Sequence, residues 1–179
     1  LVARQGLGIS TYEDMERAMK IFCNGAKMNA QEMAFKLAVG SGLGFTLAQC
    51  MSEIHIIEGR PSIGATLQLS IARSRGVRHE WVETTRTRAT LRLLIPGEAE
   101  PRDTTWTIEM ARESRLVKEG KDGSNWAKFP DAMLRARCIT TGIRMWCPEV
   151  LGMTLYDPEE IREAAQVEQV VAVRSAQTV

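Results

Sequence analysis

The densest group of functional side chains lies in residues 125–148, which read NWAKFPDAMLRARCITTGIRMWCP. This segment holds two tryptophans, three arginines and one lysine, with a single carboxylate and no histidine. Such a set is poorly suited to acid–base catalysis, which needs groups that titrate near the working pH. Guanidinium forks instead grip phosphate oxygens, and an aromatic face can stack on a base. The segment therefore predicts contact with a flat, negatively charged ligand.

The spacing of the arginines predicts where they lie. If residues 130–145 form a helix, Arg137 and Arg144 share one face, with Thr140 and Thr141 between them as further donors to phosphate. Just upstream, Trp126 and Lys128 lie on a segment that Gly123 and Ser124 are expected to make mobile. An alternative fits the spacing equally well: the arginines are merely solvated and Trp126 fills the core.

Other patterns point away from nucleotide and metal chemistry. The GSGLGF segment, residues 40–45, lacks the lysine of a phosphate-binding loop and follows a helical pattern, which favours a helix–helix connection. His55 and His79 have no second ligand at helical spacing, so structural roles are expected. The four cysteines, Cys23, Cys50, Cys138 and Cys147, are too widely spaced for a zinc site and are expected to be reduced, half-buried thiols.

Length and charge narrow the class of protein. With 179 residues, 44% hydrophobic and 25% charged, the chain is expected to form one domain, residues 1–179, trimmed at both ends from a longer protein because it begins at Leu1. No apolar run is long enough to cross a bilayer. The net charge of +1 predicts no attraction of the whole molecule to nucleic acid, but a basic stretch, residues 121–145, is followed by an acidic one, residues 148–168. The acidic part either masks the basic site or meets the basic part of a neighbouring copy.

Local patterns predict helices, then a sheet, then helices. Helices are expected from Thr11, from Asn29 with Met33, Leu37 and Ala38 inward, and over residues 46–52. The run IHIIEGRPSI predicts a hairpin with a turn at residues 58–60. A short helix with Leu67 and Ile71 on one face is then expected to end at Gly76.

Downstream the apolar period changes from helical to alternating. In residues 88–95, Ala89, Leu91 and Leu93 alternate with Arg88 and Arg92, which predicts a strand with one core face and one basic face. A turn at Pro96-Gly97 leads to a strand over residues 105–110, so residues 77–110 are expected to form an antiparallel meander. Helices are predicted over residues 111–118 and 130–145, and a last one from Asp157-Pro158-Glu159-Glu160. The order describes an α+β domain.

The basic segment resembles the signature of the RecT and Redβ family of phage single-strand DNA annealing proteins. That signature is a tryptophan, a proline, Met-Leu-Arg, a basic residue two positions later and an arginine seven further on. In this chain those positions are Trp126, Pro130, Met133, Leu134, Arg135, Arg137 and Arg144. The family's Tyr-Asp-x-x-Glu motif resembles residues 156–160, and a looser likeness covers residues 56–76.

The resemblance implies a single-strand DNA binding protein that needs no ATP or other cofactor and anneals complementary strands in recombination. It implies a homo-oligomeric ring or filament, encoded by a phage or prophage and working in the bacterial cytoplasm without a membrane. The implied partners are single-stranded DNA, the annealed duplex intermediate, a phage exonuclease and the host single-strand binding protein. Covalent chemistry and catalytic residues are not implied.

The site prediction combines the residues with the resemblance. Backbone contact is expected from Arg137, Arg144, Lys128 and Arg135, while Trp126 either stacks on a base or shapes the groove. The weaker candidates are Lys118, Lys121, Arg88 and Arg92. Asp131 stands where Redβ carries a basic residue, which puts backbone contact there in doubt. Two other functions stay open: a metal-dependent nuclease, and a purely structural self-assembling protein.

Overall fold

A computed structural model describes residues 13–14, 16–17, 20, 30–57, 59–117, 124–152, 155–158 and 160–162. The chain forms two compact units, Leu1–Ile63 and Gly64–Val179. The helix predicted from Thr11 lies largely outside the described residues. The expectation of a single domain over residues 1–179 stays a prediction.

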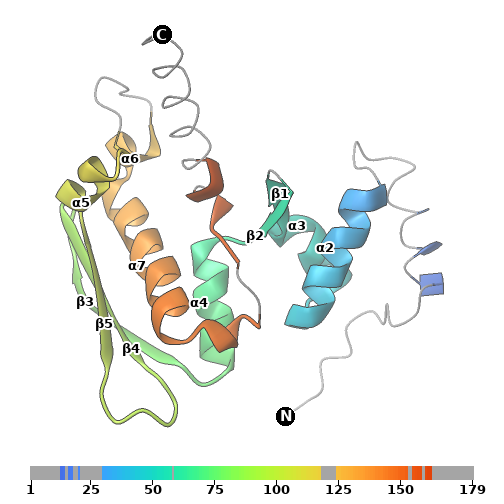
Figure 1. Ribbon diagram of the computed structural model, residues 1–179, viewed down its shortest axis with the longest axis horizontal. Helices are drawn as coiled ribbons and strands as arrows, with labels where there is room; N and C mark the ends of the chain where they lie inside the picture. The colour runs from blue at the N-terminus through green and yellow to red at the C-terminus, as the bar shows by residue number, and fades with distance from the viewer. Residues whose placement is uncertain are drawn as a thin grey trace, which may run out of the picture. The chain divides into compact units, whose positions relative to one another are not determined.

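The first unit contains helices α2 (Ala30–Leu43) and α3 (Leu47–Glu53) and strands β1 (His55–Ile57) and β2 (Arg60–Ser62) (Figure 1). Met33 and Leu37 are buried in α2 as predicted. The prediction for Ala38 was wrong: it is exposed, and Val39 is buried instead. The GSGLGF connection is shorter than expected, because α2 continues to Leu43 and only Gly44 adopts a positive φ, of 73°.

The start of α3 and the hairpin confirm the sequence prediction. Thr46 caps α3 through a capping box: its hydroxyl accepts from the Gln49 N–H at 3.3 Å, and Gln49 Oε1 accepts from the Thr46 N–H at 3.0 Å. In the hairpin, β1 and β2 are antiparallel, and the closing pair next to the turn is Ile57 with Arg60.

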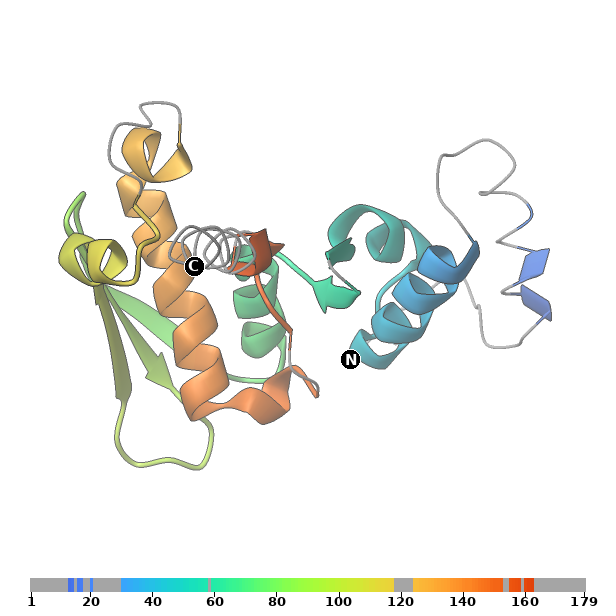
Figure 2. The ribbon, with the colours of Figure 1, turned by 45° about the horizontal axis from the view of Figure 1, so that its top comes forward.

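The second unit is an antiparallel three-stranded sheet covered on one face by helices. Its strands are β3 (Arg78–Thr84), β4 (Arg88–Leu94) and β5 (Arg102–Thr107), in the order β3-β4-β5. Helix α7 (Pro130–Trp146) runs across the sheet beside α4 (Ala65–Ser74), as Figures 1 and 2 show from two directions. This arrangement confirms the α+β fold class and the predicted meander.

The core lies between β4 and α7. Ala89, Leu91 and Leu93 of β4 are fully buried, as their alternation predicted. Helix and sheet approach closely at Gly142, where a Cβ would lie 3.0 Å from Thr104 Oγ1. A larger side chain at this position would therefore crowd the Thr104 side chain and strain the contact between α7 and the sheet.

The end of the meander differs from the prediction. Strand β5 stops at Thr107, because the Thr107 hydroxyl caps the next helix by accepting from the Met110 N–H at 3.2 Å. Ile108 and Met110, predicted as strand residues, therefore belong to α5 (Ile108–Glu113), which begins and ends earlier than the predicted helix over residues 111–118. In α4, Ile71 is buried and Leu67 is half-buried, and Gly76 follows the helix with φ 95°.

The remaining elements are α6 (Asn125–Lys128) and the 3₁₀ turn η1 (Pro148–Val150). Pro158 and residues 160–162 are helical, consistent with the last predicted helix. Helix α7 confirms the predicted helix over residues 130–145 almost residue for residue. None of the helices within the described ranges is long and apolar enough to cross a membrane.

Candidate nucleic-acid interface

Helix α7 carries its functional side chains on two sides, in addition to the side that packs on the sheet. Arg137, Thr140 and Arg144 make up the first, here called the Glu160 side because all three contact that residue. Ala132, Arg135 and Ala136 make up the second, here called the hollow side because they line a surface hollow. The helical period separates Arg135 from Arg137 by about 200° around the axis, so they point to different sides.

On the Glu160 side, both predicted arginines form ion pairs with one carboxylate. Arg144 donates through Nη1 to Glu160 Oε2 at 2.7 Å and through Nη2 to Oε1 at 2.8 Å, which is a two-pronged fork. Arg137 donates through Nη1 to Oε1 at 3.1 Å. Arg137 and Arg144 therefore share a face, as predicted, but in this conformation both are bound to one carboxylate of the chain itself.

Two further groups hold the carboxylate in place. The Thr140 hydroxyl, expected as a phosphate donor, is buried and donates to Glu160 Oε1 at 2.6 Å. The Asp157 N–H donates to Glu160 Oε2 at 3.2 Å, while Asp157 Oδ2 accepts from the Ala65 N–H at the start of α4, at 2.7 Å. Asp157, predicted to cap its own helix, thus supplies its side chain to α4, whose own N-cap residue is a glycine.

Because this cluster is buried, the interactions between its charges are strong. The side chains of Glu160, Arg137 and Arg144 are only 7%, 13% and 30% exposed. Burial alone would raise the pKa of Glu160, but hydrogen bonds from Arg144 and Thr140 and the charges of both arginines outweigh it, so its pKa is lowered. Burial lowers the pKa of Arg137, and the opposing attraction of Glu160 keeps its charge favourable.

Aromatic rings line the same cluster. The guanidinium carbon of Arg137 lies 5.8 Å from the centre of a Trp106 ring, and that of Arg144 lies 5.3 Å from the Tyr156 ring. Trp106 also donates from Nε1 to the Thr141 hydroxyl at 3.1 Å, so Thr141 is engaged as well. Cation–π contacts of this kind fix the guanidinium planes.

The hollow side is open and differs in chemistry. The hollow has a volume of about 260 Å³ and lies between α4, α7 and β3. Its lining residues are Ala65, Thr66, Leu69, Trp81, Ala132, Arg135, Ala136 and Ile139. The Arg135 side chain is 40% exposed, and it forms an ion pair at 3.5 Å with Asp131, whose side chain is equally exposed. Small residues on α7 create this space, and an indole and a guanidinium border it.

The other candidates fall in different places. Lys128 is exposed at the end of α6, directly before α7, whereas Trp126 is only 4% exposed. This burial fits the alternative in which Trp126 fills the core, and it argues against stacking, since a buried ring face is not open to a base. Lys118 and Lys121 lie outside the described residues.

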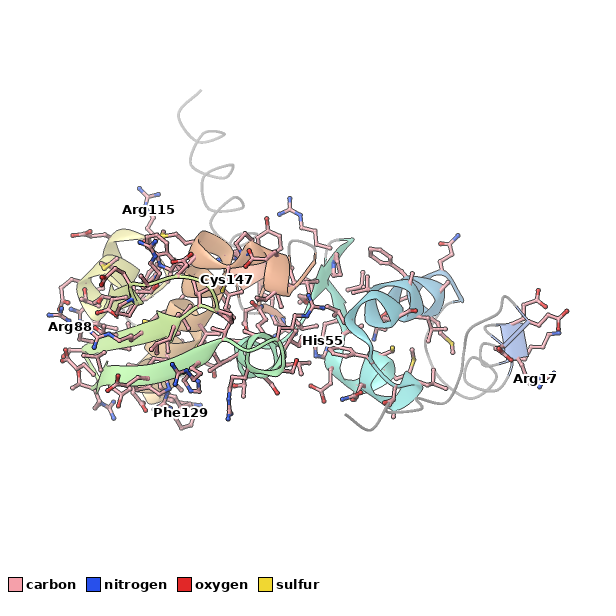
Figure 3. The ribbon with its side chains drawn as sticks, turned by 90° about the horizontal axis from the view of Figure 1, so that it is seen from below. Arg17, His55, Arg88, Arg115, Phe129 and Cys147 are labelled. Carbon is pink, nitrogen blue, oxygen red and sulfur yellow. The ribbon has the colours of Figure 1, made fainter. Side chains whose placement is uncertain are left out.

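Arg88 and Arg92 lie on the face of the sheet that points away from α7, because they alternate with the buried residues of β4. Both are paired: Arg88 with Glu83 at 3.3 Å, and Arg92 with Asp103 through two hydrogen bonds of 2.8 Å. The hydrogen bond from Arg92 lowers the pKa of Asp103. Figure 3 shows Arg88 at the outer end of the sheet. The structure thus does not bring these two arginines together with those of α7.

Groups suited to other chemistries are sparse in the described part of the chain. No cluster of three or more His, Cys, Asp or Glu residues that could hold a metal ion occurs there. Cys50, Cys138 and Cys147 are free and fully buried rather than half-buried, and burial raises the pKa of Cys138 and Cys147 to about 11. These thiols therefore stay protonated at neutral pH.

A comparison with protein-family models matches residues 53–172 to the RecT family. The chain belongs to the RecT family. The match covers α7, the Glu160 side and the hollow side, and it confirms the resemblance drawn from the basic segment. Membership in the RecT family implies that the chain anneals single-stranded DNA in recombination. No individual curated protein matches the chain.

Two residues of this RecT family chain that contact or border the candidate arginines were not among the predicted site residues. Glu160 was taken as part of an acidic stretch and of the Tyr-Asp-x-x-Glu likeness, so a signal existed, but its partners were not predicted. Trp81 sits in β3, where alternation would have placed it on the same face as its pairing partner Leu91. Its position beside Arg135 depends on how α4 and α7 meet the sheet edge, which no local pattern reports.

Proposed function

We propose that the protein binds single-stranded DNA and anneals complementary strands without ATP, acting as a homo-oligomer. The observation that carries the proposal is the RecT family match over residues 53–172, which includes every arginine of α7. The size of the assembly and the independence from ATP rest on this family relation. A phage exonuclease and the host single-strand binding protein are the proposed partners.

Annealing makes no covalent bond, so its demands are electrostatic. Two backbones of like charge must approach, and the protein must supply fixed positive charge between them. Each neutralised phosphate of a single strand adds about 0.7 to the slope of log affinity against log salt concentration. Few cations per copy bind weakly, but copies repeated along one strand bind strongly through high effective concentration. A net charge of +1 is compatible with this mode of binding.

We assign the first contact with the backbone to Arg135 and Lys128. Both side chains are accessible: Lys128 ends α6 just before α7, and Arg135 lies in the N-terminal half of α7. The hollow beside Arg135 offers the indole of Trp81 for contact with sugar or base. Arg137 and Arg144 are proposed as a second pair of backbone contacts, and their availability depends on Glu160. Contacts to phosphate rather than to base edges would leave the bases free to pair.

The test of function is annealing of two complementary labelled oligonucleotides with no nucleotide present. We expect the protein to accelerate duplex formation and to lose this effect at high salt. The same mixture with Mg²⁺ tests the nuclease alternative, which predicts shortened products. Sedimentation with and without DNA tests the structural alternative, which predicts equal assembly and no uptake of strands. No acceleration at low salt would contradict the proposal.

A test of the site must not leave a buried charge of the Glu160 cluster without its partner. Replacing Arg137 and Arg144 by alanine would leave the buried Glu160 carboxylate without its two cations. A cleaner variant combines Arg137→Met, Arg144→Met and Glu160→Gln, because exchanging a whole buried ion cluster for uncharged side chains of similar volume is often neutral. We expect this variant to fold and to bind single-stranded DNA more weakly. Unchanged affinity would remove both arginines from the proposed site.

A further inference from the structure

The carboxylate of Glu160 occupies a position that suits a backbone phosphate. A fork from Arg144, one donor of Arg137 and the Thr140 hydroxyl converge on its two oxygens within 2.6–3.1 Å. Guanidinium forks bind carboxylates and phosphates with the same planar geometry. The cluster is therefore an anion site that is filled from within the chain.

We propose that Glu160 competes with DNA for this site: its carboxylate holds Arg137 and Arg144 until a phosphodiester of single-stranded DNA replaces it. The residues around it, 155–158 and 160–162, here called the latch segment, then separate from α7. The inference rests on the proposed function, because it takes single-stranded DNA to be the ligand of α7.

The exchange conserves charge in the site. A carboxylate and a phosphodiester each carry one negative charge, so the two guanidiniums face one anion before and after the exchange. Neither end state leaves a half-buried cation without a counter-charge, which would be the costly outcome. A phosphate that approached while Glu160 stayed in place would instead meet a like charge. A phosphate therefore cannot bind Arg137 and Arg144 while the latch segment stays on α7.

The remaining contacts of the latch segment set a threshold for its release. Asp157 caps α4 through Ala65, Tyr156 lies against Arg144, and Leu155 and Ile161 are buried at 0% and 4% exposure. Release must break these contacts together, so one phosphate alone is a weak competitor. A strand already held at Arg135 and by neighbouring copies presents its next phosphate at high effective concentration. We therefore expect long oligonucleotides, and not inorganic phosphate, to open the latch.

Hydrogen exchange in the unaltered protein tests the release directly. Three amides report on the latch: Asp157, bound to Glu160 Oε2; Ile161, bound to the Asp157 carbonyl; and Ala65, bound to the Asp157 carboxylate. Addition of a saturating oligo(dT) is expected to speed their exchange, and inorganic phosphate is expected to leave it unchanged. Unchanged or slower exchange with DNA bound overturns the inference. Absence of any oligo(dT) binding by anisotropy would instead overturn the proposed function.

A charge-matched pair of variants gives the second test. Glu160→Gln weakens the internal competitor, so we expect it to bind oligo(dT) about tenfold more tightly than the unaltered protein, a typical size for coupling between two exclusive states. Glu98→Gln is the control: Glu98, in the loop between β4 and β5, forms an ion pair with Arg102 at 2.7 Å, so this variant also removes one carboxylate from an arginine. Affinity of a folded Glu160→Gln variant no higher than that of this control overturns the inference. If Glu160→Gln does not fold, the exchange experiment decides.

Discussion

The two sides of α7 present the same residue type in opposite states. Arg137, on the Glu160 side, is 13% exposed and bound to a carboxylate that is itself 7% exposed. Arg135, two residues earlier on the hollow side, is 40% exposed and has a weak, equally exposed partner in Asp131. The difference arises because the latch segment brings the Glu160 carboxylate to Arg137 and Arg144.

This contrast separates charge that holds the fold from charge that is open to a ligand. A buried ion cluster stabilises only while all its members are present, and it resists change. An exposed pair contributes little to stability, so its arginine can exchange partners freely. One helix can thus serve both as a structural element and as a binding surface, with the covering segment deciding which arginines are open.

The largest expected effect comes from removing the shared carboxylate. Glu160→Ala should lower the free energy of unfolding by about 3–5 kcal/mol, because it leaves two partly buried guanidiniums without their counter-charge. The matched variant on the hollow side, Asp131→Ala, should cost less than about 1 kcal/mol. Urea unfolding measures both, and equal losses would show that the two sides do not differ as described.

A substitution on the sheet-facing side should disturb both sides together. Gly142→Ala places a Cβ 3.0 Å from Thr104 Oγ1 and 3.4 Å from Leu93 Cδ1, so the Thr104 side chain or α7 must shift slightly. We expect a loss of about 1–3 kcal/mol, the usual range for overpacking. Gly64→Ala is the control, since its Cβ meets nothing within 4 Å and its φ is not positive. If both variants melt at the same temperature as the unaltered protein, the close helix–sheet approach does not constrain α7.

The hollow side should show its effect in binding rather than in stability. Arg135→Gln is expected to weaken oligo(dT) binding several-fold and to reduce the salt-dependence slope by about 0.7, the share of one phosphate contact. Arg112→Gln on α5 removes an exposed arginine from outside the proposed interface and should change neither quantity. Anisotropy titrations at several salt concentrations measure the slope. An unaltered slope in Arg135→Gln would exclude this arginine from the contact.

The smallest expected effect is a difference in acid stability. The folded pKa of Glu160 lies below its ordinary value of 4.5, so its ion pairs contribute fully above pH 4.5 and are lost as the pH falls through the folded pKa. Unfolding experiments from pH 6 down to about pH 3 should therefore show a decline in the unaltered protein that is shallower in Glu160→Gln. Parallel declines would mean that other carboxylates, such as Asp103, account for the acid sensitivity.

Much of the fold could be predicted because its signals are local. Alternation of apolar residues predicted β4 and its buried face. Pro130 and the helical spacing of the residues after it predicted α7. The prediction failed where a single hydroxyl decided between two structures: Thr107 ends β5 by capping α5, although the apolar alternation continues through Ile108 and Met110. A period describes which residues share a face, and it does not report where a cap interrupts the strand.

The candidate site could likewise be predicted only where its signals are local. The sequence by itself determined that Arg137 and Arg144 lie on one face of a helix, because that follows from the helical period alone. Only the tertiary structure decided that Glu160 lies between them, that Trp126 is buried and that Arg135 borders a hollow. The Glu160 contacts join residues 16 and 23 positions apart along the chain, and their strength comes from burial under a segment that folds back over α7. Burial is a property of the assembled core, so no short stretch of sequence carries it.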